Sequence, residues 1–437
     1  MSNLAILGGT PVRRVAFQPW PQYRTSDADR LQQVLESRHW GGFPVPSRYA
    51  GEFAERFAAL QGARYGLCVA NGTIALVIAL QAAGVRFGDE VIVPAYTWDG
   101  TAIAVLMAGA IPIFADVDPD TYCLDPKSVE RAITPRTRAI MPVHLAMRFA
   151  DMDALADLAQ QHNLKVIEDC AHAHGGSYKG RGAGSMGDLG AFSFQESKIM
   201  TAGEGGMVIT SSLQYYEHLQ STVNCGRASL TDKYHQRVLG GNYRMTEFQA
   251  AMLVGQLEML PEFARRRADA AARLSRELEG IDSVRPLPPQ DEITQDTIYC
   301  YLFQYRPEVP RVSRDLFVAA LDAEGIPCDG RFYEPVYRSD LFYATPENSP
   351  QLTVGREAPV DYSAVQCTVS ERAAYEEAVW LPQFLLIGGD RDVDDIIEAV
   401  AKVSAGLDEL ASADPSLAGV KAMGRAQRAR HERQKNY

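Results

Sequence analysis

The sequence predicts an α/β fold with a mostly parallel central sheet flanked by helices, followed by a smaller C-terminal α+β domain. Between residues 64 and 170, short apolar runs typical of strands alternate with segments of helical periodicity. Near residue 256 this alternation gives way to a long charged helix. Because strands separated by helices pair in parallel through crossover connections, helices are expected on both faces of the sheet.

The elements of the first part follow one another in a regular order. Strands are expected at 64–70, 90–95, 111–117, 138–145 and 164–170, and helices at 73–85, 100–110, 125–133 and 152–163. The helix at 125–133 has a clear start, because Asp125 suits the N-cap and Pro126 suits the first helical position.

The second part predicts a separate, smaller domain. Its long helix contains Pro261, which is expected to kink or break it. A strand at 298–306 and a helix at 313–325 follow. These patterns predict a large domain at 1–255, a small domain at 256–415 and a basic tail at 416–437, expected to be solvated or frayed.

Composition excludes several classes of protein. The 437 residues are 46% hydrophobic and 22% charged, which is typical of a globular chain. A net charge of -12 argues against a nucleic-acid partner. Seven scattered cysteines without a CxxC pair indicate reduced thiols, and no apolar run approaches the about 18 residues of a membrane span. A cytoplasmic protein without a membrane partner is expected.

The segment 182–187 matches G-x-G-x-x-G, a pattern found in dinucleotide-binding proteins. That pattern requires a strand before it and a helix after it. Here a glycine-rich loop precedes it and the strand-like run LGAFSF follows. The sequence therefore does not predict a nicotinamide site.

Four possible zinc ligands lie close together, at Asp169, Cys170, His172 and His174. Their packed spacing is not that of a closed structural zinc site, and His144 is the only obvious additional ligand. No metal is expected.

Three other features suit a phosphorylated, planar cofactor. Asp169 lies at the carboxyl end of an apolar strand, where open α/β sheets bind ligands. Gly72 and Thr73 begin a helix, where backbone N–H groups and the helix dipole favour a phosphate. Trp98 follows another strand and is able to stack on a ring.

Lys198 completes this set, with the hydroxyl of Ser193 five residues before it. Individually, these residues have ordinary interpretations as a surface lysine, a core aromatic, an N-cap and a turn carboxylate. Together they are what pyridoxal 5'-phosphate requires: a lysine amine that forms a Schiff base, a carboxylate for the ring nitrogen, a phosphate cradle and a stacking aromatic.

The order of several motifs carries a resemblance to a known family. NGTIAL, PAYTWDGTAIAVL, EDCAHAHGG, GAFSFQESKIMTAGEGGMVIT and GGNYRMTEFQAAML occur in that order. The chain resembles the sugar and aminocyclitol aminotransferases of pyridoxal-phosphate fold type I, over most of its length. The resemblance implies that Lys198 is the Schiff-base lysine, that Asp169 pairs with the ring nitrogen and that His172 lies at the ring hydroxyl. By the same resemblance, Trp98 stacks on the ring, and the phosphate is held by Gly72, Thr73 and Ser193. The resemblance also implies a homodimer, in which Asn242 reaches the phosphate from the neighbouring subunit.

The resemblance also implies an activity. Relatives that dehydrate their substrates carry histidine at the lysine position, so Lys198 favours transamination. In SRHWGG, SFQESKIMTAGEGG and PVHLAMRFADMDAL, the chain resembles glutamine-dependent scyllo-inosose-type aminotransferases and aminohydroxybenzoate synthases more than enzymes that act on nucleotide-linked sugars. An amino group is therefore expected to move from L-glutamine or L-glutamate to a keto-cyclitol or keto-sugar, in secondary-metabolite biosynthesis.

Three alternatives remain open: an aromatising lyase like aminohydroxybenzoate synthase, a nucleotide-keto-sugar aminotransferase, and a non-catalytic protein that binds pyridoxal phosphate. This family commonly has an aromatic residue or histidine, followed by glycine, where this chain has Ala146 and Met147. The composition of the acceptor pocket, and hence the identity of the acceptor, is therefore not predicted. Tyr333 and Arg244 are candidate substrate residues, and Arg331 is among the arginines available for a nucleotide phosphate.

Overall fold

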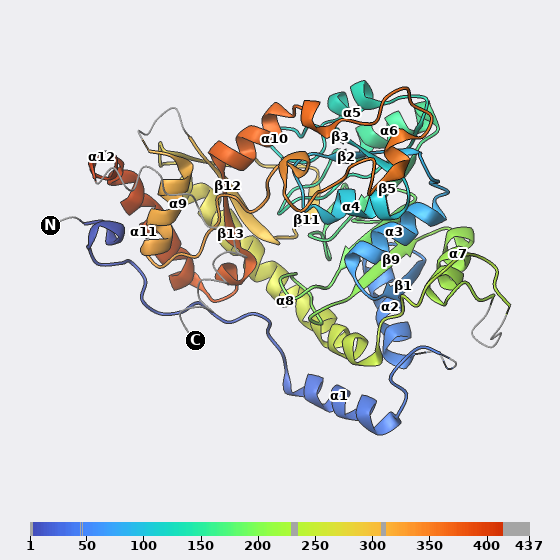
Figure 1. The fold of residues 1–437 in the computed structure, drawn as a ribbon. Coiled ribbons are helices and arrows are strands. Elements are labelled where there is room, and N and C mark those ends of the chain that lie inside the picture. The colour runs from blue at the N-terminus through green and yellow to red at the C-terminus, as the bar shows by residue number, and fades with distance from the viewer. Residues whose placement is uncertain (1–2, 44, 46, 229–234, 307–311, 414–437) are drawn as a thin grey trace.

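The computed structural model describes residues 3–43, 45, 47–228, 235–306 and 312–413 of the chain. It has a larger part around a central sheet and a smaller part around a second sheet, and helix α8 runs along both (Figure 1). The basic tail predicted at 416–437 lies outside the described residues.

The central sheet has seven strands in the order β1-β9-β8-β5-β4-β2-β3. They are β1 (Tyr65–Val69), β2 (Glu90–Pro94), β3 (Ile111–Ala115), β4 (Thr137–Ile140), β5 (Lys165–Asp169), β8 (Leu189–Ser193) and β9 (Gly206–Thr210). Only β9 runs antiparallel to its neighbours in this sheet. The prediction of a mostly parallel α/β sheet is confirmed.

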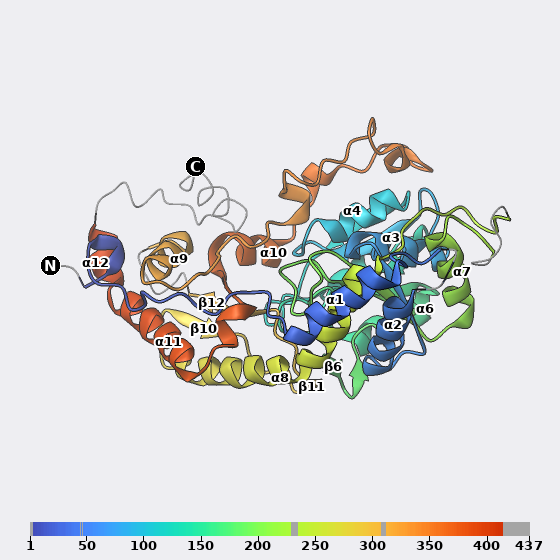
Figure 2. The same ribbon diagram turned by 90° about the horizontal axis from the view of Figure 1, so that it is seen from below.

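Helices cover both faces of this sheet (Figure 2). One face carries α3 (Gly72–Ala82), α4 (Gly100–Met107) and α7 (Leu213–Val223), and the other carries α2 (Arg48–Leu60), α5 (Pro126–Ala132), α6 (Met152–His162) and part of α8. The side chain of Asp125 caps α5 by accepting hydrogen bonds from the N–H groups of Lys127 and Ser128. Helix α1 (Thr25–Ser37) packs on α8. The sequence analysis did not anticipate α1 or α2.

Helix α8 (Glu247–Leu278) begins about nine residues earlier than predicted and continues through Pro261. Thr246 starts it, because its hydroxyl accepts from Gln249 N–H while the Gln249 side chain accepts from Thr246 N–H. The prediction at Pro261 was a kink or a break, and the break is wrong, because burial of Leu260 and Leu274 holds the helix on both sides of the proline. The kink stays a prediction. Since α8 crosses residues 255 and 256, the division into domains stays a prediction.

The smaller part contains an antiparallel sheet in the order β10-β12-β13. Its elements are β10 (Val284–Pro286), β12 (Cys300–Tyr305), α9 (Arg314–Ala323), α10 (Thr368–Arg372), a π-helical segment (Ala373–Glu377), β13 (Ala378–Pro382), α11 (Asp390–Ala405) and α12 (Leu407–Ser412). A third sheet joins β6 (Ser177–Tyr178), β7 (Arg181–Gly182) and β11 (Ile293–Gln295). Within the described residues, no helix is long and apolar enough to cross a membrane.

Candidate active site

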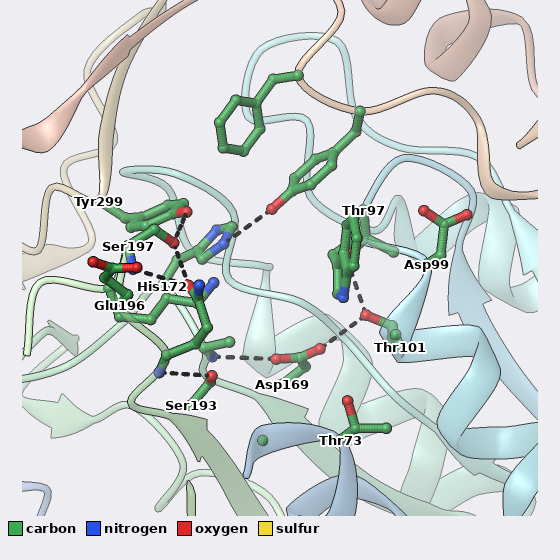
Figure 3. Close-up of a pocket in the computed structure, with 18 of the residues that line it drawn as sticks. Thr73, Thr97, Asp99, Thr101, Asp169, His172, Ser193, Glu196, Ser197 and Tyr299 are labelled. Atoms are coloured by element: carbon green, nitrogen blue, oxygen red, sulfur yellow. Dashed lines mark hydrogen bonds between the residues drawn. The ribbon is translucent and has the colours of Figure 1, made fainter. Parts of the chain in front are cut away.

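An open cavity of about 1540 Å³ lies at the carboxyl ends of β1, β2, β5 and β8. The loop at residues 331–341, from the smaller part, contributes to its wall. Nine of the residues singled out from the sequence line this cavity: Gly72, Thr73, Trp98, Asp169, His172, Ser193, Lys198, Arg331 and Tyr333. Figure 3 shows several of them converging from separate elements.

Asp169 is the last residue of β5 and is 5% exposed. Its Oδ2 accepts a hydrogen bond from Thr101 Oγ1 at 2.9 Å, and its Oδ1 accepts from Ala171 N–H at 3.2 Å (Figure 3). Burial raises the pKa of Asp169, although these hydrogen bonds and the charge of Lys198 oppose the effect. A carboxylate in this position gains from a cation, so it fits the protonated ring nitrogen of pyridoxal phosphate.

The turn between β1 and α3 forms a close-fitting cradle. Asn71 is the N-cap of α3, and its side chain accepts a hydrogen bond from Ile74 N–H. A Cβ atom at Gly72 would lie 2.6 Å from the Cβ of Ser193, so only glycine allows β8 to approach so closely. The start of α3 and the Ser193 hydroxyl therefore meet at one edge of the cavity, an arrangement that fits a phosphate.

Lys198 follows β8 and faces an aromatic side chain from the smaller part. Its Nζ lies 4.5 Å from the ring centroid of Tyr299. The Tyr299 hydroxyl is 2.9 Å from Ser197 Oγ, and its ring stacks on His172 with centroids 3.9 Å apart (Figure 3). Trp98 is 51% exposed in the same cavity. The lysine amine thus lies close to the Tyr299 ring, in the same cavity as Trp98.

Hydrogen bonds fix the tautomer of His172. Ala146 N–H donates to His172 Nδ1 at 3.2 Å, so the proton of the neutral ring is on Nε2. Nε2 then donates to the Tyr333 hydroxyl at 3.2 Å, which leaves the Tyr333 proton available to a ligand. Burial, and next the charge of Lys198, hold the pKa of His172 well below its usual range.

Ala146 has the left-handed backbone conformation, with φ of 56°, that makes this contact possible. Its carbonyl accepts from Tyr299 N–H at 2.9 Å, while its own N–H serves His172. An alanine in this conformation costs about 1 kcal/mol. The backbone of Ala146 therefore helps to orient both His172 and Tyr299.

The G-x-G-x-x-G segment binds a carboxylate of the protein itself. The N–H groups of Gly184, Met186 and Gly187 donate to Glu168 at 2.8, 2.7 and 2.6 Å. His144 Nε2 lies 2.9 Å from the same carboxylate. Glu168 and His144 are both buried, and the glycines of this segment form a nest of N–H groups around the Glu168 carboxylate.

Asn242 and Arg244 lie outside the cavity of their own chain. Asn242 forms an isolated bridge with Asn224, and Arg244 Nη1 donates to Asn224 Oδ1 at 2.8 Å. The expectation that Asn242 serves a neighbouring subunit, and that Arg244 contacts substrate, stays a prediction. The sequence analysis missed Thr101 and Tyr299, although Thr101 lies at the start of a helix that follows a strand, a recognisable position for a ligand contact.

Comparisons with known proteins agree with this geometry. Residues 22–401 match the DegT/DnrJ/EryC1/StrS aminotransferase family. The chain belongs to this family. Its fold is that of the pyridoxal-phosphate enzymes of fold type I, and the prediction of an aminotransferase is confirmed.

Individual relatives cover nearly the whole chain of this aminotransferase. A protein of Streptoalloteichus tenebrarius with the provisional name L-glutamine:3-amino-2,3-dideoxy-scyllo-inosose aminotransferase is 46% identical over 94% of this chain and 99% of its own. The L-glutamine:2-deoxy-scyllo-inosose aminotransferase of Streptomyces paromomycinus is 37% identical over 92% and 97%. The crystal structure of 3-amino-5-hydroxybenzoic acid synthase superposes with a TM-score of 0.81 at 34% identity, covering 91% of this chain and 99% of that one.

Proposed function

We propose that the chain uses pyridoxal 5'-phosphate to transfer an amino group from L-glutamine, or L-glutamate, to a keto-cyclitol or keto-sugar. The observation that carries this proposal is the convergence of Lys198, Asp169 and the start of α3 in one cavity. When bound, the cofactor supplies an electron sink for breaking the bond between the donor's α-carbon and its hydrogen.

The residues around the cavity have separate parts in this reaction. Lys198 binds the cofactor covalently and, once displaced by the donor, its amine moves a proton from the donor's α-carbon. Asp169 keeps the ring nitrogen protonated, and His172 lies beside the ring hydroxyl. Trp98 stacks on the ring. Gly72, Thr73 and Ser193 hold the phosphate.

The charges around the cavity favour an acceptor without phosphate groups. Among the described residues that line it, the acidic side chains are Asp99, Asp169, Glu196, Glu204, Glu334 and Asp340, whereas the basic ones are Lys198 and Arg331. A nucleotide-linked sugar brings two negative charges into this field, and arginines are the usual partners of its phosphates. A neutral or amino-bearing cyclitol ketone meets no such repulsion, which agrees with the names of the two glutamine-dependent relatives.

We also infer a homodimer in which Asn242 completes the site of the neighbouring subunit. Its position outside its own cavity supports this arrangement.

Half-reactions test the proposed function. The holoenzyme is treated with L-glutamine until the visible band of the lysine-bound cofactor disappears, and is then freed of donor. Scyllo-inosose-type ketones, 3-keto hexoses and a nucleotide-linked keto sugar are offered in turn. We expect the band to return with an unlinked ketone, and Lys198→Ala to show neither band nor turnover. Return of the band only with the nucleotide-linked ketone would contradict the acceptor assignment, and an aromatic absorbing product formed by loss of water would indicate the lyase.

A further inference from the structure

Arg331 is a cation in the cavity wall to which the reaction scheme above gives no role. Lys198 and Arg331 are the basic side chains among the described residues that line this cavity. Lys198 supplies the amine that binds the cofactor, so it is committed to the reacting centre. The amino donor also carries an α-carboxylate, which requires a positively charged partner once it leaves water.

A buried ion network fixes the guanidinium of Arg331. Its Nε donates to Asp315 Oδ2 at 3.0 Å, and the other oxygen of Asp315 accepts from Arg314 Nε at 2.9 Å. Arg314, whose side chain is fully buried, is anchored in turn by the carbonyls of Ala374 and Ala378, at 2.7 and 2.6 Å. One carboxylate is thus shared by two guanidinium groups, so Asp315 positions Arg331 without neutralising both positive charges.

The neighbouring backbone is built around this network. A Cβ atom at Gly330 would lie 2.4 Å from Arg314 Nε, so glycine is needed where the chain passes Arg314. Arg331 follows immediately and is only 25% exposed. The guanidinium also lies 5.3 Å from the ring centroid of Tyr375, in the π-helical segment. These contacts restrict the side chain before any ligand arrives, which reduces the entropy cost of binding.

The outer nitrogens of Arg331 remain for a ligand. Within the described part of the chain, neither Nη1 nor Nη2 donates a hydrogen bond. Glu334 Oε1 forms a long ion pair with Nη1, at 3.9 Å. The side chain of Glu334 is 40% exposed and pairs across this distance only weakly. A carboxylate is able to displace it and accept two parallel N–H hydrogen bonds.

Arg331 belongs to the loop that contacts the reacting centre. The next residue, Phe332, packs edge-on against Tyr299, with centroids 6.2 Å apart, and Lys198 Nζ lies 4.5 Å from the same Tyr299 ring. Tyr333 then bonds to His172. A ligand at Arg331 therefore shares the cavity with the lysine that carries the amino-transfer chemistry.

We propose that Arg331, positioned by Asp315 and Arg314, binds the carboxylate of the amino donor and thereby selects α-amino acids over simple amines. This inference rests on the proposed function for the identity of the donor. It assigns to the smaller part of the molecule the recognition of the donor, beside a larger part that holds the cofactor.

The test measures binding to the holoenzyme, so that it does not depend on turnover. The probe is 4-carbamoylbutanoate, which is glutamine without its α-amino group, and titration calorimetry gives its Kd. Glutaramide, in which an amide replaces the carboxylate, is the neutral comparison. We expect the wild type to bind the acid and not the amide. Arg331→Gln should raise the Kd of the acid about 10- to 100-fold, which is the range for a charge-assisted hydrogen-bonded pair.

Matched variants separate a binding role from a structural one. Arg338→Gln removes an exposed arginine from the same loop, which pairs with Glu371 at 3.5 Å and does not line the cavity, and is expected to leave Kd unchanged. Glu334→Gln removes the competing carboxylate and is expected to tighten binding by about two- to fivefold. Arg331→Lys keeps the charge but not the paired N–H groups, so its Kd for the acid should lie between those of the wild type and Arg331→Gln.

Several results would overturn the inference: no binding of the acid by the wild type, equal binding by Arg331→Gln, or equal loss in Arg338→Gln. Failure of the proposed function looks different. If the wild type binds the acid through Arg331 but transfers nitrogen to no ketone, the carboxylate site stands and the amino-transfer proposal falls.

Discussion

Thr101, in the first turn of α4, donates a hydrogen bond of 2.9 Å to Asp169 at the end of β5. Both side chains are buried, and Thr101 Oγ1 also lies 3.2 Å from Thr97 Oγ1. The start of α4, which follows β2, thus fixes the orientation of a carboxylate at the end of β5, two strands away in the sheet. Asp169 is held in one direction before a cofactor binds.

Asp169→Asn should reduce amino transfer by about 10²- to 10³-fold, because an amide cannot keep the ring nitrogen protonated. The apoprotein should melt at an equal or higher temperature, since burial raises the pKa of Asp169 and a neutral side chain avoids that cost. Steady-state rates, cofactor content and thermal unfolding test this. Thr101→Val should reduce the rate of amino transfer about tenfold, because it removes one hydrogen bond to a charged group. A wild-type rate in Asp169→Asn at full cofactor content would contradict the role.

Tyr333→Phe should raise the KM for the acceptor about tenfold and leave the donor half-reaction nearly unchanged. The physical reason is that His172 Nε2 donates to the Tyr333 oxygen, which directs the Tyr333 proton toward a ligand. Tyr337→Phe is the matched control, because the Tyr337 hydroxyl donates to Glu371 at 2.9 Å and does not line the cavity. Single-turnover measurements of each half-reaction separate the effects. An equal loss in both half-reactions would indicate instead that Tyr333 only supports His172.

Local patterns predicted much of the larger part. The strand before Asp169 and the helix that begins at Gly72 were both predicted, because apolar periodicity and helix starts are encoded within about ten residues. Their meeting at one sheet edge followed from parallel pairing, which places all carboxyl ends together. The same argument placed Trp98 and Lys198 in the cavity.

Contacts between distant segments were not predictable from one sequence. Tyr299, the residue before β12, lies against Lys198. Arg331 depends on Asp315 and, through Arg314, on the carbonyls of Ala374 and Ala378. No local pattern encodes such pairs, because their separation in the chain reflects how the smaller part packs on the larger. The unbroken α8 at Pro261 has a similar origin, since tertiary packing overrides the local cost of the proline.

Acid should destabilise the apoprotein through His174. Burial lowers the pKa of His174 to about 3, and its Nε2–H donates to the Ser193 carbonyl at 2.8 Å. In the unfolded chain His174 binds a proton near pH 6.5, whereas in the folded chain it stays neutral until about pH 3. This histidine therefore costs no stability above about pH 6.5, and it lowers the free energy of unfolding as the pH falls from 6.5 toward 3. In that window, each such histidine lowers the free energy of unfolding by about 1.4 kcal/mol for every pH unit that the pH falls. His172 shifts in the same direction.

Urea unfolding of the apoprotein at pH 5, 6, 7 and 8 measures this slope. His174→Phe should lower the free energy of unfolding at pH 8, because the hydrogen bond to Ser193 is lost, while reducing the slope below pH 6 by about one proton. At low pH the lost hydrogen bond lowers the free energy of unfolding, whereas the lost titration of His174 raises it, so the two effects can be separated. An unchanged slope in His174→Phe would show that the native state accepts a proton at this site.

Asn242 should act in the site of the neighbouring subunit. It lies outside its own cavity, beside Asn224 and two residues before Arg244, so its own chain gives it no ligand to contact. Lys198→Ala and Asn242→Ala should each be inactive alone. After subunit exchange between equal amounts of the two, half of the dimers are mixed, and each mixed dimer has one site with both residues intact. Activity should therefore return to about a quarter of the wild-type value. Exchange of Lys198→Ala with itself should restore nothing, and a fully active monomer in sedimentation would show that no neighbouring subunit is needed.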